Sequence, residues 1–273
     1  MKRYLAKIAY FLFILLLLCP GLALAWGPAM HLYLGDALLA GAAVLLPSVG
    51  SLLKRFSQHF LYGSLSADFF VGKGYRANGG KYHNWETGML IRHGAETDEE
   101  RAFAAGFLAH LAADTVAHGY FIPHFAGCTP LPTRVTHLYW EWLADCSINR
   151  RKYNLFIKSA CQYRRKGRPA FTMMDDYLCS VLDLDKGLYL SRKSLYLYPV
   201  RIMTKSSPLN TLSGRHKALL DDTFPSYALS SLKVMADVLT YHEDSPVLSM
   251  SPNCKYSTGT YLSKGRKNSV QFS

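Results

Sequence analysis

The sequence lacks several features that would identify its class at once. None of its six cysteines lies in a Cys-x-x-Cys pair, so a zinc site built from thiolates is not expected. After residue 25 no apolar run is long enough to span a bilayer, which argues against a multi-span membrane protein. No internal repeat or second domain is apparent. Acidic residues are also scarce, with 19 Asp and Glu against 31 Lys and Arg, and the net charge of +12 favours anionic partners such as lipid headgroups or polynucleotides.

The first 25 residues have the pattern of an export signal. A basic start is followed by an apolar run and then by helix breakers ahead of a small-residue cleavage pattern: Lys2, Arg3 and Lys7, residues 8–18, Pro20 and Gly21, and Ala23-Leu24-Ala25. We therefore predict a signal peptide over 1–25, cleavage that makes Trp26 the first residue, and a secreted or periplasmic protein. The alternative is an uncleaved membrane anchor, because the apolar stretch approaches spanning length.

The remaining chain is predicted to be one all-α domain over 26–245, followed by a loop or disordered tail over 246–273 that is rich in Ser, Lys and Gly. It keeps five cysteines, and their pairing cannot be read from the sequence. Helical patterns dominate, and we predict helices over 32–46, 52–61, 97–118, 133–149, 173–182 and 224–241, with a glycine-rich loop over 72–81. Gly63-Ser64 is expected to end the second helix, and Pro225 to lie in the first turn of the last. Thr97-Asp98-Glu99-Glu100 forms a capping box for the third.

Two of these helices carry polar side chains at a spacing that suits metal binding. His110, Asp114 and His118 are four residues apart, so they share one stripe of a helix whose other residues are mostly small or apolar. His137 and Glu141 repeat the spacing on the next helix. Imidazole and carboxylate ligands without thiolate suit zinc in a hydrolytic role. Ordinary hydrogen-bonded polar pairs have the same spacing, so the pattern alone leaves both interpretations open.

Further motifs give the chain a resemblance to a known family. They occur in the order Trp-Gly-Pro-Ala-Met-His at 26–31, Gly-Ser-Leu-Ser-Ala-Asp ending at Asp68, Lys-Tyr-His-Asn-Trp around His83, and then the two helical motifs. The stretch from Trp26 to about residue 149 resembles the zinc-dependent phospholipase C family, which shares its fold and a trinuclear zinc site with fungal single-strand nucleases. In that family the freed amino-terminal tryptophan binds zinc through its amine and its carbonyl.

The resemblance implies three zinc ions per chain and a ligand for each position of the family's site. The first zinc would take Asp68, His83, His110 and Asp114, the second would take His118, His137 and Glu141, and the third would take Trp26, His31 and a bridge from Asp114. A zinc-bound hydroxide would attack phosphorus, because clustered zinc brings the pKa of a bound water near neutrality. Asp68 is the candidate catalytic residue, as a general base close to that water.

One position departs from the family's pattern. The family has a histidine six residues after the helix aspartate, where this sequence has Tyr120. His118 is the first substitute because it stays on the stripe of Asp114, and His124 is the second. His59, His93, His216 and His242 match no motif and are interpreted as ordinary polar positions.

The sequence therefore predicts an exported zinc-dependent phosphodiester hydrolase, with a phospholipase C acting on phospholipids as the first interpretation. Peripheral contact with an anionic membrane surface would suit its positive charge, and no obligate protein partner is inferred. A single-strand nuclease or nucleotidase on the same site is the second interpretation. The third is an exported protein in which zinc only stabilises the fold.

Overall fold

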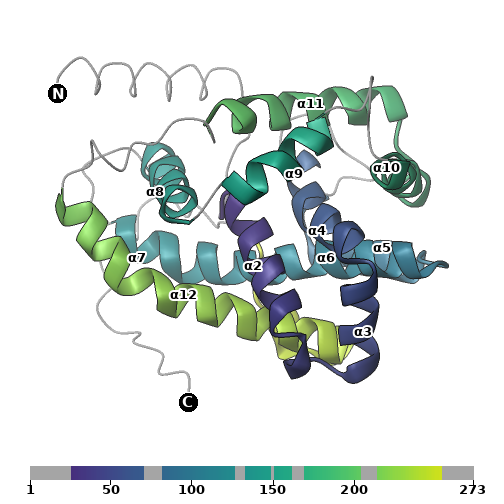
Figure 1. Cartoon of the computed structure of the whole chain (residues 1–273), viewed down its shortest axis with the longest axis horizontal. Coiled ribbons are helices and arrows are strands. Elements are labelled where there is room, and N and C mark those ends of the chain that lie inside the picture. The colour runs from purple at the N-terminus through teal and green to yellow at the C-terminus, as the bar shows by residue number, and fades with distance from the viewer. Residues whose placement is uncertain are drawn as a thin grey trace.

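Helix α6 (Asp98–Val116) runs through the middle of the computed structural model, and α4, α5 and α12 pack directly against it (Figure 1). The structure describes residues 26–70, 82–126, 133–148, 151–161, 169–203 and 214–253, and within these ranges it contains helices and no strand. The predicted all-α class is confirmed. The predicted signal peptide at 1–25 and the loop at 72–81 lie outside the described residues.

The elements up to and including α6 and the segments between them carry His31, Asp68, His83, His110 and Asp114. These elements are α2 (Pro28–Ala40), the 3-10 turn η1 (Ala42–Val44), α3 (Pro47–Arg55), α4 (Ser57–Ser66), the 3-10 turn η2 (Ala67–Phe70), α5 (Trp85–His93) and α6. The elements after it are the π-helical turn η3 (Ala117–Phe121), α7 (Ile122–Ala126), α8 (Thr133–Ser147), α9 (Arg151–Cys161), α10 (Pro169–Val181), α11 (Lys186–Met203), α12 (Gly214–Tyr241), η4 (His242–Asp244) and η5 (Pro246–Ser249).

Helix α6 begins where the sequence predicts. Thr97 Oγ1 accepts a hydrogen bond from the Glu100 amide (3.2 Å), and Glu100 Oε2 accepts one from the Thr97 amide (3.0 Å). This capping box satisfies backbone donors that the first turn leaves unpaired. From Ala102 onward nearly every side chain of α6 is buried, because helices cover it on all sides. His110 and Asp114 are therefore held in the interior.

Glycines allow α4 and α6 to cross in backbone contact. A Cβ atom added at Gly63 would lie 1.9 Å from the carbonyl oxygen of Phe103, and one at Gly106 would lie 1.9 Å from that of Phe60. The prediction that Gly63-Ser64 ends a helix is thus wrong, since α4 continues to Ser66. Gly63 serves the crossing, which leaves no room for any side chain.

Other boundaries also differ from the sequence-based expectation. The apolar stretch 32–46 is not one helix, because α2 ends at Ala40 and Pro47 begins α3. Helix α12 starts at Gly214, so Pro225 lies inside it and not in its first turn. Helices α5, α9 and α11 were not predicted, although α9 buries Tyr153, Ile157 and Ala160 at spacings of four and three.

The chain after α8 adds a second layer of helices. Figure 1 shows α9, α10 and α11 gathered on one side of the body, while α12 lies along α6 on the other. A buried polar network fixes α11: Lys193 Nζ donates to Asp175 Oδ2 (2.7 Å), and Tyr189 donates to Asp175 Oδ1 (2.7 Å). Among the described residues, no helix is both long enough and apolar enough to cross a membrane.

The glycine crossing gives a prediction of stability. Gly106→Ala should lower the free energy of unfolding by about 1–3 kcal/mol or more, because its methyl group would be driven into the backbone of α4. Chemical denaturation measures the change. Gly119→Ala is the matched control, since a Cβ there meets nothing within 4 Å, and it should leave stability equal or raise it by up to about 1 kcal/mol. Equal effects of the two substitutions would contradict the close crossing.

Candidate metal centre

Four buried side chains from three segments converge on one point in the interior. Asp68 comes from η2, His83 from the segment before α5, and His110 and Asp114 from α6; one ligand atom of each lies within 4.8 Å of all the others. The Nε2 atoms of His83 and His110 are 2.9 Å apart, and Asp114 Oδ2 lies 3.2 Å and 3.4 Å from them. Asp68 Oδ1 lies 3.4 Å from His110 Nε2. Two nitrogens and two carboxylates arranged in this way form a zinc-type donor set.

The backbone fixes which nitrogen of His110 faces this point. Its Nδ1 lies 2.8 Å from the carbonyl oxygen of Ser64 at the end of α4, so Nδ1 carries the proton and donates it. In neutral imidazole the Nε2 lone pair then faces Asp68, His83 and Asp114. A histidine that ligates a metal commonly has its second nitrogen held by a carbonyl in this way. The close crossing of α4 and α6 makes this contact possible.

Charge in the interior favours a cation at this point. Burial lowers the pKa of His110, but the carboxylates of Asp68 and Asp114 outweigh burial and raise it to about 10. Conversely, burial raises the pKa of Asp114, yet His110 and His31 hold it well below its usual value. Two ionised carboxylates are therefore buried together, and such groups require compensating positive charge. A divalent cation would supply that charge and use the histidine lone pairs as well.

His31 of α2 lies beside this cluster. Its ring stacks on that of His110, with centroids 3.7 Å apart, and its Nε2 is 3.2 Å from Asp114 Oδ1. Asp114 thus presents one oxygen to His31 and the other to His83 and His110, as a bridging carboxylate would. Among the described residues, Nδ1 of His31 has no hydrogen-bond partner although it is buried. A buried nitrogen left in this state costs free energy unless a ligand uses it.

His118, His137 and Glu141 form a second group. The His118 and His137 rings are perpendicular, with centroids 5.0 Å apart, and His137 Nε2 lies 2.8 Å from Glu141 Oε1. Burial lowers the pKa of His118 to about 4 and that of His137 to about 3, so both are neutral at physiological pH. Neutral imidazole is the form that binds metal. Asp114 and His83 also act electrostatically on His118, which links the two groups.

A π-helical turn carries His118. The amide of Ile122 donates to the carbonyl of Ala117, five residues back, and Pro123 follows. Proline has no N–H and its ring would clash with a carbonyl four residues earlier, so the wider turn accommodates it. His124 lies beyond the turn, is exposed, and has its Nδ1 3.0 Å from the Tyr227 hydroxyl. Of the two candidate histidines, the structure thus places His118 beside His137.

Trp26 is fixed at the start of the described chain. Its side chain is fully buried, its indole Nε1 donates to Ser231 Oγ (3.2 Å), and its ring packs on Phe121 of the π-helical turn. Asp145 holds the next residues, accepting hydrogen bonds from the amides of Met30 (2.9 Å) and Ala29 (3.3 Å) at the start of α2. The segment that precedes His31 is therefore anchored to both α12 and α8.

Asp145 belongs to this arrangement but was not predicted from the sequence. It extends the stripe of His137 and Glu141 by one more step of four residues, and that spacing is a signal that could have found it. Gly27 packs against its carboxylate, since a Cβ at Gly27 would lie 2.4 Å from both carboxylate oxygens. The contact joins the α8 stripe to the segment of Trp26 and His31.

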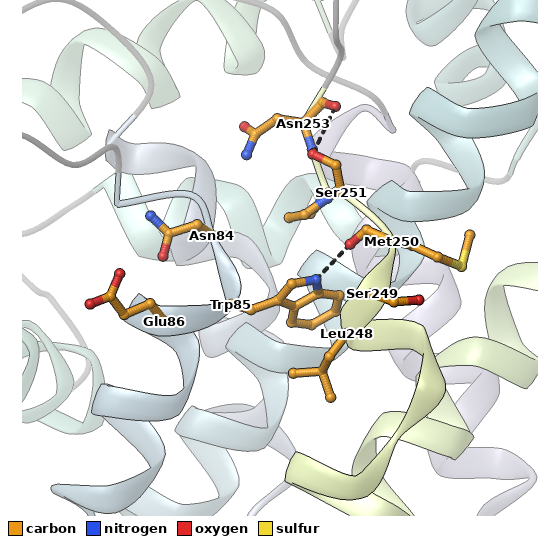
Figure 2. A pocket seen from close by; sticks show the side chains of 9 residues that line it. Asn84, Trp85, Glu86, Leu248, Ser249, Met250, Ser251 and Asn253 are labelled. Carbon is orange, nitrogen blue, oxygen red and sulfur yellow. Dashed lines mark hydrogen bonds between the residues drawn. The ribbon is translucent and has the colours of Figure 1, made fainter.

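The segment after α12 makes hydrogen bonds to His83 and to its neighbour Trp85. Asn253 Nδ2 donates to the carbonyl oxygen of His83 (2.7 Å), and Figure 2 shows the indole of Trp85 donating to the Met250 carbonyl (2.7 Å). Between these residues lies an open hollow of about 450 Å³, lined on one side by residues 84–86 and on the other by 248–253. Part of the predicted tail at 246–273 is thus packed beside a site residue, and nothing in the sequence signalled this.

The two histidines near the π-helical turn give a prediction. His118→Ala should remove zinc or weaken its binding, because it deletes a buried nitrogen that faces His137, whereas His124→Ala should leave zinc content unchanged. Element-specific mass spectrometry after dialysis against a weak chelator measures both. Loss of zinc in the His124 variant with retention in the His118 variant would reverse the assignment.

Acid and base should both destabilise the zinc-free protein. His118 and His137 have folded-state pKa values of about 4 and about 3, below the usual value of free histidine. Their contribution to the free energy of unfolding is therefore complete above about pH 6.5 and is lost as the pH falls. Each loss is on the order of 3 kcal/mol. His110, with a pKa of about 10, contributes fully below about pH 6.5 and loses its contribution as the pH rises toward 10. Thermal unfolding in excess chelator should show greatest stability near pH 6.5, and a flat profile from pH 4 to 9 would contradict these environments.

Comparison with known proteins identifies the family of this chain. The model of the zinc-dependent phospholipase C family matches residues 30–177, more than half of the 273-residue chain. No curated protein and no solved structure matches. The matched range contains all of the candidate metal ligands named above except Trp26. The chain belongs to the zinc-dependent phospholipase C family.

Proposed function

We propose that the protein is an exported zinc-dependent phosphodiester hydrolase and that phospholipids are its substrates. The observation that carries this proposal is the convergence of Asp68, His83, His110 and Asp114, with two histidine Nε2 atoms 2.9 Å apart in a buried site. Burying these two carboxylates together costs free energy unless a cation compensates their charge. The family is one of zinc-dependent hydrolases.

The candidate ligands are assigned to three zinc ions. In this assignment Asp68, His83, His110 and Asp114 hold the first ion, and His118, His137 and Glu141 hold the second. His31, the free oxygen of Asp114 and the amine and carbonyl of a processed Trp26 hold the third. The 3.2 Å contact between His31 and Asp114 supports the bridge between the first ion and the third.

Bound zinc would supply Lewis acidity toward water and toward the phosphoryl oxygens. The chain's own residues supply orientation and proton transfer. The Asp68 carboxylate is the proposed acceptor of a proton from the attacking water. His137 and Glu141 would hold a second ion, whose remaining coordination positions would admit water or a substrate oxygen.

Export is part of the proposal because the third ion needs a free amine. An uncleaved precursor has an amide at Trp26, which is a poor zinc ligand. The anchoring of Trp26 by Ser231 and of α2 by Asp145 means that cleavage would leave the new terminus in a fixed place. The preference for phospholipid rests on the family. The processed chain would keep 28 Lys and Arg against 19 Asp and Glu, and its net charge of +9 supports contact with an anionic lipid surface.

A substrate assay tests the function. The processed protein should release diacylglycerol from phosphatidylcholine vesicles, and excess chelator should abolish the release while added zinc restores it. Single-stranded DNA is the parallel substrate, and Asp114→Asn is the inactive control because it removes one of the bridging oxygens. Nucleotide release without diacylglycerol would indicate a nuclease. Stoichiometric zinc with neither product would indicate a site that only stabilises the fold.

A further inference from the structure

Asp68 receives a hydrogen bond from a part of the chain that the family model does not cover. The hydroxyl of Tyr196, on α11, donates to Asp68 Oδ2 at 2.7 Å, and both side chains are buried. The other oxygen, Oδ1, is the one that faces His110 at 3.4 Å and His83 at 4.0 Å. The family match ends at residue 177, nineteen residues before Tyr196.

We infer that Tyr196 is a positioning residue for the metal centre, which holds Asp68 so that only Oδ1 is presented to the ion. This inference rests on the proposed zinc site. A carboxylate with one oxygen already bonded to a phenol is pre-organised as a monodentate ligand, because rotation about its last torsion would break that bond. Without the phenol the carboxylate can rotate, and Oδ2 can compete with Oδ1.

The phenol remains a donor in this environment. Burial and the neighbouring Asp68 carboxylate raise the pKa of Tyr196 well above its ordinary value, so the hydroxyl keeps its proton. Its ring also packs on Phe69, the residue after Asp68, with centroids 5.7 Å apart. Tyr196 therefore touches both the carboxylate and the turn that carries it.

A buried network keeps Tyr196 at this place. Tyr189 and Lys193 lie seven and three residues before it, so all three share one face of α11. Lys193 donates to Asp175 of α10 and to the Tyr62 hydroxyl of α4 (2.5 Å), and Tyr62 donates to Asp175 Oδ1. Because α4 leads directly into η2 and Asp68, the network ties α11 to the same segment that Tyr196 contacts.

Tyr189 offers a matched control on the same helix. It is as buried as Tyr196, and its hydroxyl also donates to a buried carboxylate at 2.7 Å, but that carboxylate is Asp175, outside the metal centre. Tyr196→Phe and Tyr189→Phe each remove one such hydrogen bond. A purely structural role would give both variants the same phenotype.

The experiment compares zinc affinity in the full processed chain. Zinc dissociation constants are measured by competition with a chromophoric chelator, and the visible spectrum of cobalt-substituted protein reports the ligand geometry. Tyr196→Phe should weaken zinc binding by about 10- to 100-fold and alter the cobalt spectrum. Tyr189→Phe should keep both at wild-type values even where its unfolding midpoint falls. In an Asp68→Asn background, Tyr196→Phe should add less than about twofold.

Wild-type affinity and spectrum in Tyr196→Phe would overturn the inference while leaving the zinc site intact. Equal losses of affinity in Tyr189→Phe would also overturn it, because the effect would then be general loosening of α11. If the wild-type protein itself binds no zinc, both the inference and the proposed function fail, so the wild-type titration separates the two failures.

Discussion

Burial of two ionised carboxylates next to one another is the constraint on which the interior of this protein depends. Asp68 and Asp114 are almost fully enclosed, and their close contacts in the described part of the chain include the imidazoles of three histidines and the phenol of Tyr196. Such a pair is unfavourable without a compensating cation. The crossing of α4 and α6 at Gly63 and Gly106 creates the arrangement, since it brings the Ser64 carbonyl to His110 and the turn carrying Asp68 to the same place.

The grouping of the candidate ligands on α6 and α8 could be predicted from the sequence because helix periodicity determines it. Residues four apart on α6 and on α8 must share a stripe, so the grouping of His110 with Asp114 and of His137 with Glu141 is a matter of geometry. The placement of Asp68 and His83 came from family resemblance, since η2 and the segment before α5 have no periodicity to read. The helix ends were less predictable at Gly63, which allows the crossing of α4 and α6, and at Pro225, which lies inside α12.

The contacts that hold the ligands could not be read from the sequence, because they depend on which distant segments pack together. Tyr196, Ser231 and Asn253 lie beyond residue 177, and each bonds to a predicted site residue: Asp68, Trp26 and His83 respectively. The part of the chain outside the family match thus contributes the surroundings of the ligands. All of the candidate ligands except Trp26 lie within the family match, and the helices after it supply the contacts of Tyr196 and Ser231.

Zinc stoichiometry of the purified, processed protein tests the account most directly. Element-specific mass spectrometry, with the amino terminus sequenced on the same sample, should give close to three zinc ions per chain that begins at Trp26. Asp114→Asn should lose most of that metal because Asp114 contacts His31, His83 and His110. A processed wild-type chain that holds no stoichiometric zinc would contradict the account at its centre.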